Sequence, residues 1–498
     1  MEPLVFLGAA AVVVGFVLFG TLFTATAKEV FEGVQAFIAT TLGWLYVLTT
    51  SLLVGFAIWL MFSRFGHVRL GKDDDRPEFG RVAWFTMLFS AGMGTGLVFW
   101  SVAEPLRHYI RPPRGEGGTA EAVQEAMRLA FFHWGLHPWA IYIVLGVALA
   151  YHHFRHDLPL APRSVLHPLL GDRIYGPIGH GVDILATAGT LFGVATSLGL
   201  GAMQVNAGLQ RSMGLPHGTM IQVIIIATIT AVATISVVLG VHKGIRRLSE
   251  LNMILAAVLI VFVLVAGPTL FQIELFVTSV GRYAQELVAT SLWLDPRPDA
   301  DWQKNWTLFY WGWWIAWAPF VGVFVARISR GRTVRDFVVS VFVVPTLVTF
   351  AWFGVFGGTG LYLERFTDAA LASAVRGTPS IALHAMLEHL PLADLTTAMA
   401  TALIVVFFIT SSDSGSLVVD MVTSGGHPNP PVAQRVFWAL SEGAVAATLL
   451  VAGGLQALRA ASIASGLPMM LLLGAAAVGL VKRLRREPSG RPGENRNR

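Results

Sequence analysis

The chain has 498 residues, of which 54% are hydrophobic and 13% are charged, and its mean hydropathy is +0.64. Soluble globular domains carry about 25% charged residues, so the composition excludes a water-exposed surface of this size, and lipid must cover much of the chain. The absence of cysteine excludes disulfides, thiolate metal sites and cysteine nucleophiles. The composition therefore predicts an all-α, polytopic membrane protein.

Apolar stretches long enough to cross a bilayer recur along the chain. A spanning helix takes about 20 mostly apolar residues. Twelve stretches meet that requirement: 4–23, 41–62, 83–103, 129–151, 179–205, 219–240, 250–270, 305–326, 337–357, 394–411, 435–453 and 462–481. The sequence thus predicts twelve transmembrane helices with no long soluble domain between them.

Basic residues are distributed unevenly between the predicted loops. With the N-terminus inside, most of the 35 Lys and Arg fall on the inner side, in clusters at 64–81, 243–247, 327–335 and 482–486. Inner loops of membrane proteins carry such an excess of positive charge. The pattern predicts a multi-pass protein of the cell inner membrane with both termini cytoplasmic. It accounts for the net charge of +5 without a nucleic-acid partner.

Two segments outside the predicted spans differ from ordinary loops in composition. In 271–293, apolar residues alternate with Glu274, Arg282 and Glu286. This pattern fits a helix at the outer membrane interface, and it fits an ordinary surface helix of the 271–304 loop equally well. Residues 482–498 are basic and rich in Arg, Gly, Pro and Asn, which predicts a short disordered cytoplasmic tail.

Two predicted spans contain residues that interrupt helices. Span 83–103 contains three glycines within 92–96, and span 305–326 contains Pro319. Gly weakens a helix and Pro breaks it. In inverted-repeat transporters, broken helices at matching positions of the two halves mark a binding site at the membrane midplane. Close helix packing and a simple kink are the alternatives, but the matching positions favour a site between the segments 83–270 and 305–481.

Aromatic residues are concentrated in two of the spans. One cluster is Trp311–Trp317, and the other is His133–Tyr142, where the rings surround Pro138. Rings from two helices can form a cage for a cation that keeps its charge and donates no hydrogen bond, each face contributing about 0.5–2 kcal/mol. No acidic residue lies within 83–103, 129–151 or 305–326, as expected for a site that binds quaternary ammonium or tertiary sulfonium groups.

Other function classes are less consistent with the sequence. His133 and His137 are four residues apart, a spacing that can bind metal, but no third ligand is evident, so we interpret them as polar or packing residues. No intramembrane catalytic set is present, which excludes an enzyme. A channel is an alternative, although broken helices around an aromatic cage suit occlusion better than continuous conduction.

The same spans offer sites for a carboxylate and for a coupling ion. Amide groups freed around 92–96 can bind a carboxylate. The hydroxyls of 410–414, together with carbonyls near Ser90 and Met93, are oxygen ligands of the kind that Na⁺ prefers. A cage for an onium group beside an anion site predicts that the solute is a betaine and that Na⁺ drives its uptake.

Several of these segments resemble one known family. Ala91–Trp100 and the following Ala103–Leu106 resemble the glycine-stretch motif of the betaine/choline/carnitine transporters, and Trp306–Arg335 resembles their signature in the eighth span. His133–Tyr142 and Thr410–Ser416 also match. The resemblance implies a LeuT-type fold of twelve helices assembled as a homotrimer. It assigns 1–82 to two helices outside the repeat and sets the five helices of 83–270 inverted against the five of 305–481.

The resemblance also implies binding residues at matching positions. The aromatic box would be Trp134, Trp139, Tyr142 and Trp314, with Trp313 and Trp317 along the route and Met93, Gly94, Thr95 and Gly96 at the other end of the solute. One sodium site would use Ser90, Met93, Phe407, Thr410 and Ser411. A second would use Thr190, whose partner position is Val194; Thr187 or Thr196 could substitute, so the sodium stoichiometry stays open.

The substrate class follows from the same comparison. Family members that take choline or carnitine tend to have Asp where this chain has Gly96, so its absence favours a zwitterion such as glycine betaine or dimethylsulfoniopropionate. The hydroxyl of Thr95 leaves room for ectoine or proline. Alternatives within the same fold are sodium-independent substrate/product antiport and H⁺-coupled choline or carnitine transport. The short tail argues against strong osmotic gating.

Overall fold

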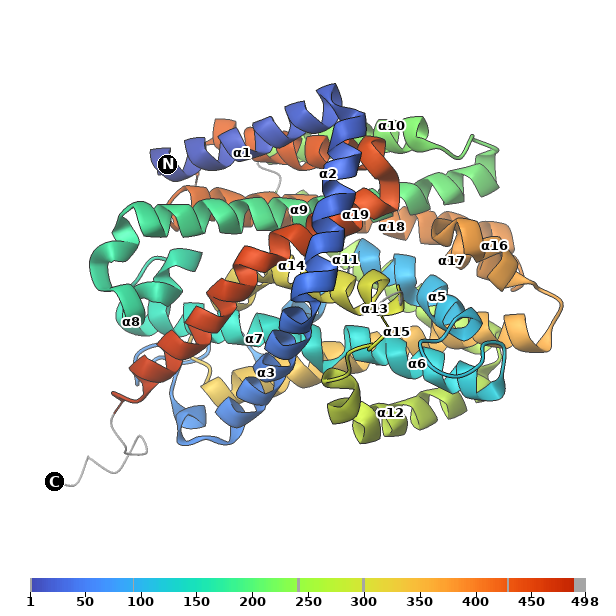
Figure 1. Cartoon of the computed structure of the whole chain (residues 1–498), viewed down its shortest axis with the longest axis horizontal. Helices are drawn as coiled ribbons and strands as arrows, with labels where there is room; N and C mark the ends of the chain where they lie inside the picture. Colours follow the sequence, from blue (N-terminus) through green and yellow to red (C-terminus); the bar gives the residue numbers. More distant parts are fainter. Residues whose placement is uncertain (1, 93, 240–241, 298–300, 428–429, 488–498) are drawn as a thin grey trace.

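The computed structural model describes residues 2–92, 94–239, 242–297, 301–427 and 430–487. Its secondary structure is helical throughout these ranges, apart from one isolated β-bridge between Arg69 and Thr333. The prediction of an all-α protein is confirmed. Many long helices run across the view of Figure 1, whereas α2, α3 and the last part of α19 run at a steep angle to them.

The long helices are α1 (Pro3–Leu22), α2 (Thr24–Phe37), α3 (Gly43–Phe62), α4 (Arg81–Gly92), α5 (Thr95–Ile110), α6 (Ala120–Trp134), α7 (Leu136–Ala150), α9 (Pro177–Met213), α10 (Thr219–Leu239), α11 (His242–Ala266), α12 (Thr269–Ser291), α14 (Thr307–Arg327), α15 (Val334–Phe366), α18 (Ala393–Thr423) and α19 (Val432–Leu484). Short ones are α8 (His167–Leu170), α13 (Trp302–Asn305), α16 (Leu371–Gly377) and α17 (Ala382–Leu387), with single turns η1 (Ile38–Leu42), η2 (Arg64–His67), η3 (Tyr151–Arg155), η4 (Pro162–Leu166), η5 (Gly171–Tyr175) and η6 (Pro379–Ile381).

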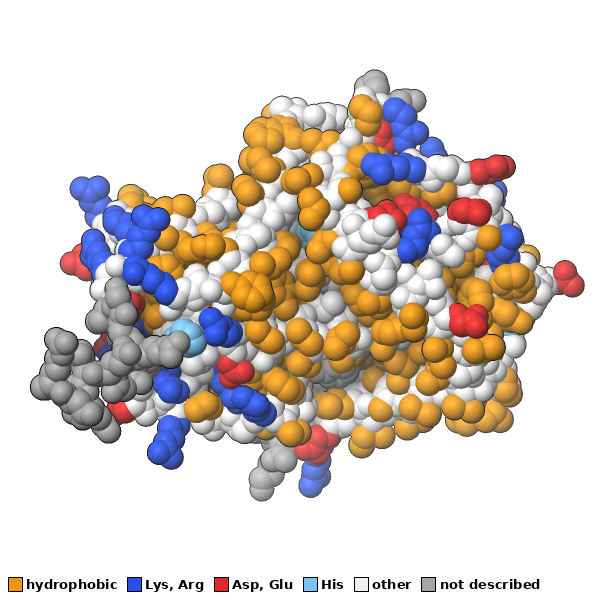
Figure 2. Space-filling view, turned by 90° about the horizontal axis from the view of Figure 1, so that it is seen from below, with side chains coloured by type: hydrophobic (Ala, Val, Ile, Leu, Met, Phe, Trp, Pro, Cys, Tyr) orange, Lys and Arg blue, Asp and Glu red, His pale blue; other side chains and the backbone are white. Residues whose placement is uncertain are grey.

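The surface is that of a membrane protein with several spans. Within the described residues, nine helical stretches are long and apolar enough to cross a membrane. Figure 2 shows hydrophobic side chains over the middle of the molecule, with charged side chains gathered towards its two ends. A bilayer needs such an apolar band between two polar rims. The count of twelve spans and the inverted repeat stay predictions.

The helices with the aromatic clusters lie at the centre. Ala120–Arg155 and Trp302–Arg327 are 94% buried over their most apolar windows, whereas Pro3–Leu22 is only 22% buried. A helix that is apolar on all sides and exposed, such as α1, fits a lipid-facing position. The two aromatic helical segments are instead covered by protein on every side, so their rings do not form an interfacial belt.

The predicted breaks in spans 83–103 and 305–326 have different outcomes. In the first span, α4 ends at Gly92 and α5 begins at Thr95, with Gly94 in an extended conformation (φ −156°, ψ −178°), so this prediction is confirmed. In the second span, α14 continues through Pro319 without interruption, so the prediction of a break there is wrong. Proline removes one backbone hydrogen bond of the helix, but a helix that is packed on all sides can stay continuous without that bond.

Two further interruptions occur at glycines. The span predicted at 129–151 is divided between α6 and α7 by Gly135. Within α19, the backbone leaves the helical conformation at Gly453 and Gly454 (φ 57° at the latter). The second interruption lies between the predicted spans 435–453 and 462–481, and the chain turns there (Figure 1).

The predicted helix at 271–293 is present as α12, which lies at the lower edge of the molecule in Figure 1. One of its faces packs on α6 and α15. The opposite face exposes Val277 and Val288, at 63% and 71% of their surface. A helix with this division fits either of the two positions predicted for it, at the membrane interface or on the surface of a loop.

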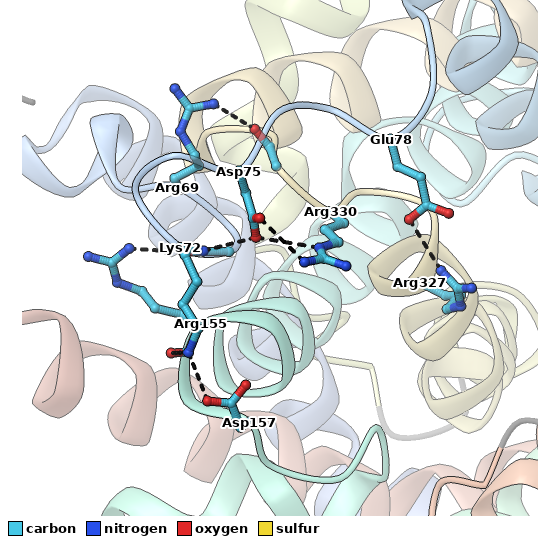
Figure 3. A network of polar contacts seen from close by, with 10 residues as sticks. Arg69, Lys72, Asp75, Glu78, Arg155, Asp157, Arg327 and Arg330 are labelled. Atoms are coloured by element: carbon cyan, nitrogen blue, oxygen red, sulfur yellow. Dashed lines mark hydrogen bonds and ion pairs between the residues drawn. The ribbon is translucent and has the colours of Figure 1, made fainter.

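At the end of the molecule that carries the α3–α4 loop, ion pairs join three loops (Figure 3). Lys72 Nζ lies 2.8 Å from Asp157 Oδ2, beyond α7. Arg330 Nη2 lies 3.3 Å from Asp75 Oδ1, and the loop of Arg330 connects α14 to α15. These pairs attach the ends of the central helices α7 and α14 to the loop between α3 and α4.

Backbone hydrogen bonds reinforce this junction. The Leu70 amide donates to the Arg332 carbonyl (2.8 Å), the Gly331 amide donates to the Leu70 carbonyl (2.8 Å), and the Val334 amide donates to the Val68 carbonyl (2.9 Å). These bonds surround the isolated bridge between Arg69 and Thr333. We call the paired segments 68–70 and 331–334 the backbone clasp. The clasp fixes the start of α15 against the loop that precedes α4.

Candidate functional site

Gly135 allows α6 and α7 to meet at an angle in the centre of the protein. A Cβ atom at this position would lie 2.6 Å from the Phe131 carbonyl oxygen, 2.8 Å from the Tyr283 hydroxyl and 3.0 Å from the Phe350 ring. No side chain fits at such distances. The Tyr283 hydroxyl instead accepts a hydrogen bond from the Leu136 amide (3.0 Å), one of the free N–H groups at the start of α7.

Trp134, the last residue of α6, forms an aromatic corner with α14. Its ring lies 4.8 Å from the Trp314 ring at an interplanar angle of 74°, and 6.2 Å from the Trp313 ring at 87°. Trp313 and Trp314 stack at 4.7 Å. Rings that meet edge to face present their faces as two walls of a corner, which is the element from which a cation cage is built.

The indole N–H groups of this corner are used for positioning. Trp314 Nε1 donates to the His133 carbonyl (3.1 Å), and Trp134 Nε1 donates to Glu104 Oε2 (2.9 Å). Trp134 and Trp314 are only 5% and 6% exposed. Because both N–H groups are bonded, the orientation of each ring is fixed and the ring faces remain for contact with a ligand.

Glu104 is a buried carboxylate with four donors. His133 Nδ1 lies 2.7 Å and His108 Nε2 3.2 Å from Oε1, while the Tyr310 hydroxyl and Trp134 Nε1 donate to Oε2. Trp302 Nε1 donates to His108 Nδ1 (3.2 Å), so the proton of His108 is on Nε2 and points at Glu104. A buried carboxylate requires this degree of hydrogen bonding.

Glu104 is not among the predicted site residues, because the predicted span 83–103 ends one residue before it. The expectation that no acidic residue lies deep in the aromatic region is therefore wrong, since Glu104 is fully buried in α5 and bonded to Trp134. The available signal was its place in the Ala103–Leu106 motif. Ligand atoms of Glu104, His108 and His133 lie within 4.8 Å of one another, but the two carboxylate oxygens are already saturated by the donors named above.

The other two residues of the predicted box form a second pair on α7. The Trp139 and Tyr142 rings lie 5.5 Å apart at 77°, and both are 3% exposed. The Tyr142 hydroxyl has no hydrogen-bond partner among the described residues. No ring contact between described residues joins this pair to Trp134 or Trp314. The structure thus places the predicted box residues in two separate buried pairs, Trp134 with Trp314 at the α6–α14 contact and Trp139 with Tyr142 on α7.

Two glycines let the remaining tryptophans of α14 lie against neighbouring backbone. A Cβ atom at Gly96 would lie 2.2 Å from the Trp313 ring, and one at Gly193 would lie 2.2 Å from Trp317. Trp313 Nε1 also donates to the Gly193 carbonyl (3.2 Å). The glycine stretch therefore places α5 directly against the aromatic face of α14, and the neighbouring Thr95 hydroxyl donates to the Ser197 carbonyl of α9 (2.8 Å).

The chain is similar to known proteins along almost its whole length. Residues 4–489 match the model of a family described as the BCCT, betaine/carnitine/choline family transporters. The chain belongs to this family. It is 46% identical over 97% of its length to an uncharacterized transporter of Mycobacterium tuberculosis, of which 82% is covered. It is 44% identical to the glycine betaine transporter OpuD of Bacillus subtilis (93% and 90% covered) and 42% identical to a probable glycine betaine transporter of Desulfitobacterium hafniense (96% and 96%). The protein is a betaine/choline/carnitine-type transporter and not an enzyme.

Of the residues of the first predicted sodium site in this transporter, Ser90 lies on α4, and Phe407, Thr410 and Ser411 lie on α18. A Cβ atom at Gly94 would lie 3.9 Å from Ser411 Oγ and 4.0 Å from Trp317, so the α4–α5 break faces this part of α18. Thr410 Oγ1 donates to the Val406 and Phe407 carbonyls (3.0 and 3.2 Å). Met93 and the side chain of Ser90 lie outside the described residues.

The second predicted sodium site of the transporter lies on α9. Thr190 is buried, and so is Val194 one turn later. Thr196 is already satisfied, because its hydroxyl donates to the Phe192 carbonyl (2.9 Å) and pairs with Ser462 Oγ (2.9 Å). The Thr187 hydroxyl has no partner among the described residues, so it remains available as a substitute ligand.

A second buried carboxylate of the transporter was also missed. Glu442 of α19 is fully buried and accepts a hydrogen bond from Ser412 Oγ (2.9 Å), while its Oε1 has no partner within the described part of the chain. A Cβ atom at Gly415 would lie 2.9 Å from Val194 and 3.0 Å from Glu442 Oε1. An acid inside an apolar span was the signal in the sequence, because intramembrane ionisable groups are rare and functional.

Proposed function

We propose that this transporter imports a zwitterionic onium solute, glycine betaine or a close analogue such as dimethylsulfoniopropionate, together with Na⁺ by alternating access. The observation that carries the proposal is the buried corner of Trp134 and Trp314, backed by Trp313, in the core of a membrane protein. A quaternary ammonium or sulfonium group binds ring faces without needing a hydrogen bond. Two relatives described above carry the words glycine betaine in their names.

The absence of a side chain at 96 supports a zwitterion as the solute. A Cβ atom there would lie 2.2 Å from the Trp313 ring, so an Asp could not occupy this position without displacing the ring. Without that carboxylate, a net cation such as choline lacks a partner at this place. A betaine brings its own carboxylate, which the backbone around 92–96 is proposed to bind.

Sodium coupling is supported by the oxygen groups around the α4–α5 break. Ser411 faces Gly94 across this break, and Thr410 and Phe407 lie on the same stretch of α18. Hydroxyl and carbonyl oxygens of this kind suit Na⁺. We propose one sodium ion here and a second at Thr190, with Thr187 as its additional hydroxyl.

We further propose a LeuT-type architecture with twelve spans, in which 83–270 and 305–481 are inverted repeats, and assembly as a homotrimer in the inner membrane. The breaks at Gly94 and Gly135, both in the first repeat, support the irregular backbone that such a site requires. The basic clusters at 64–81 and 327–335 support cytoplasmic termini.

The proposal is tested with purified protein in liposomes. We expect uptake of radiolabelled glycine betaine that requires an inward Na⁺ gradient, and competition by the sulfonium analogue stronger than by choline, ectoine or proline. Trp314→Ala should reduce uptake to less than about one tenth, since two ring contacts are lost; Trp44→Ala, an exposed tryptophan of α3, is the control. Equal uptake without sodium favours antiport, dependence on a proton gradient favours H⁺ coupling, and full uptake by Trp314→Ala removes the box from the mechanism.

A further inference from the structure

A cavity opens at the end of the molecule opposite the network of Figure 3. It has a volume of about 700 Å³ and lies between the end of α5, the short α13 and the part of α19 that follows the Gly453–Gly454 interruption. With the topology proposed above, this end faces the outside. The cavity is large enough for a small organic solute with water around it.

The charged residues of the cavity wall are mostly arginines. They are Arg107, Arg111, Arg297, Arg376 and Arg459, against a single acid, Asp301. That acid is paired with Lys304 (3.8 Å), and Arg297 is paired with Asp295 (2.7 Å). The net charge of the wall is strongly positive, and a concave surface of one sign concentrates ions of the opposite sign.

Arg459 is the most unusual of these residues. Its side chain is 3% exposed, and neither Nε nor Nη2 has a hydrogen-bond acceptor among the described residues. Three rings lie over its guanidinium, those of Trp100, Trp306 and Phe309, at 5.6, 5.6 and 5.2 Å. Rings stabilise the face of a guanidinium, but they accept nothing from the N–H groups at its edge, and an unmet donor on a buried charge is costly.

Arg107 offers a second free donor to the same cavity. Its Nη2 donates to the Val375 and Arg376 carbonyls (3.3 and 2.9 Å), while its Nε is buried without an acceptor among the described residues. Two guanidinium groups therefore line one cavity, and each has a buried N–H donor without an acceptor among the described residues. A planar anion with two oxygens satisfies such donors in pairs.

We propose that this cavity is an anion subsite that receives the carboxylate of the incoming zwitterion before its onium group reaches the aromatic box. This inference rests on the proposed function and adds a second place of contact to it. Ring contacts connect the two places: Trp306 and Trp100 lie 5.2 Å apart, Trp100 and Phe309 6.1 Å, and Phe309 stacks on Trp313 at 5.5 Å. Because a betaine is too short to span both places, its carboxylate contacts Arg459 first and leaves it as the solute moves on to the aromatic corner.

The same N–H donors can bind an inorganic anion such as chloride. The test therefore distinguishes the carboxylate of the solute from an inorganic anion. Arg459→Gln should raise the KM for glycine betaine about tenfold, the loss expected for one charge-assisted contact, with little change in maximal rate. Arg459→Lys keeps the charge without the planar fork and should lie between. The control is Arg211→Gln, an exposed residue of α9 paired with Glu388 that does not line the cavity.

Chloride should compete with betaine for uptake by the wild type, and this competition should be lost in Arg459→Gln. In the chloride-free reference condition, the sulfonate buffer MES replaces chloride and the Na⁺ concentration is kept constant. Uptake that depends on chloride would assign the site to an inorganic anion and overturn the proposal. An unchanged KM in both Arg459 variants would overturn it as well.

Binding of the two halves of a betaine can be measured without transport. Sodium acetate should raise the midpoint of thermal unfolding of the wild type but not of Arg459→Gln or Arg107→Gln, whereas tetramethylammonium should raise it in all three. Acetate stabilisation that persists in both variants contradicts the anion subsite. If tetramethylammonium does not raise the unfolding midpoint of the wild type, the aromatic box is contradicted instead. Failure of the anion subsite and failure of the aromatic box are therefore distinguishable.

Discussion

The two ends of the transporter use arginine in opposite ways. At the end drawn in Figure 3, arginines lie against carboxylates: Arg155 is 2.8 Å from both Asp73 and Glu487, and Arg330 is 3.3 Å from Asp75. At the other end, Arg459 and Arg107 keep N–H donors without acceptors among the described residues. The paired arginines of Figure 3 hold loops together, whereas Arg459 and Arg107 have the free donors that the proposed anion subsite requires.

The half that contains the cavity also has a buried carboxylate, but its hydrogen bonds go elsewhere. Glu104 accepts its four hydrogen bonds from histidine, tryptophan and tyrosine side chains. It therefore fixes the aromatic corner and leaves Arg459 unpaired. The position of acids relative to arginines, and not the number of arginines, therefore separates the loop junction from the proposed anion subsite.

The largest expected effect is at Glu104, the carboxylate that accepts hydrogen bonds from the aromatic corner. In Glu104→Gln, one oxygen becomes an NH₂ group facing existing donors, and each donor left unpaired costs about 1–3 kcal/mol. We expect the KM for betaine to rise more than tenfold and the unfolding temperature in detergent to fall. Glu121→Gln, at an exposed position in the first turn of α6, is the control. Wild-type KM in Glu104→Gln would show that the carboxylate does not position Trp134.

A smaller but clear effect is expected in the glycine stretch between the two ends. Gly96→Ala places a methyl group 2.2 Å from the Trp313 ring, so the ring must move, and overpacking of this kind costs about 1–3 kcal/mol. Betaine uptake should fall roughly tenfold. Gly55→Ala in α3, where no atom lies within 4 Å of the added Cβ, should leave uptake unchanged. Equal uptake by both variants would contradict the close contact.

The smallest effect is expected at the paired end. Partial burial acts to raise the pKa of Asp75, but the hydrogen bond from the Lys72 amide and the charge of Arg330 outweigh it and hold the pKa below its usual value. Ionised Asp75 therefore stabilises the folded state above the unfolded pKa of about 3.9, and this contribution is lost as the pH falls through the folded pKa.

Asp75→Asn should lower the stability by less than about 1 kcal/mol at pH 7, without changing the KM for betaine. Thermal unfolding at pH 3 to 7 measures this, and the difference from the wild type should shrink towards pH 3. Asp74→Asn, an exposed neighbour, is the control. A constant difference across that range would contradict a role for the ionised carboxylate.

The sequence predicted the features that depend on local composition. Apolar runs indicated the membrane spans, and three glycines in 92–96 predicted the interruption between α4 and α5, because glycine acts on its own backbone. The crowding of tryptophan in 311–317 predicted a buried aromatic segment. In each case the physical cause lies within a few residues of its effect.

What could not be predicted depends on residues far apart in the chain. Pro319 does not break α14, because packing on all sides of that helix decides the outcome. The interruption at Gly135 depends on Tyr283 and Phe350, more than a hundred residues away. Glu104 entered the aromatic site only when α5, α6 and α14 were brought together. The orphan donors of Arg459 could not be inferred from the chain at all, since a missing partner has no sequence signal.

The backbone clasp of 68–70 and 331–334 limits how far substitutions can loosen this end. Side-chain pairs such as Arg330 with Asp75 can be weakened by substitution or by salt, but the three amide-to-carbonyl bonds of the clasp depend on no side chain. The clasp joins two segments that lie far apart in the chain, so side-chain substitutions that remove the ion pairs leave the loop before α4 held against the start of α15.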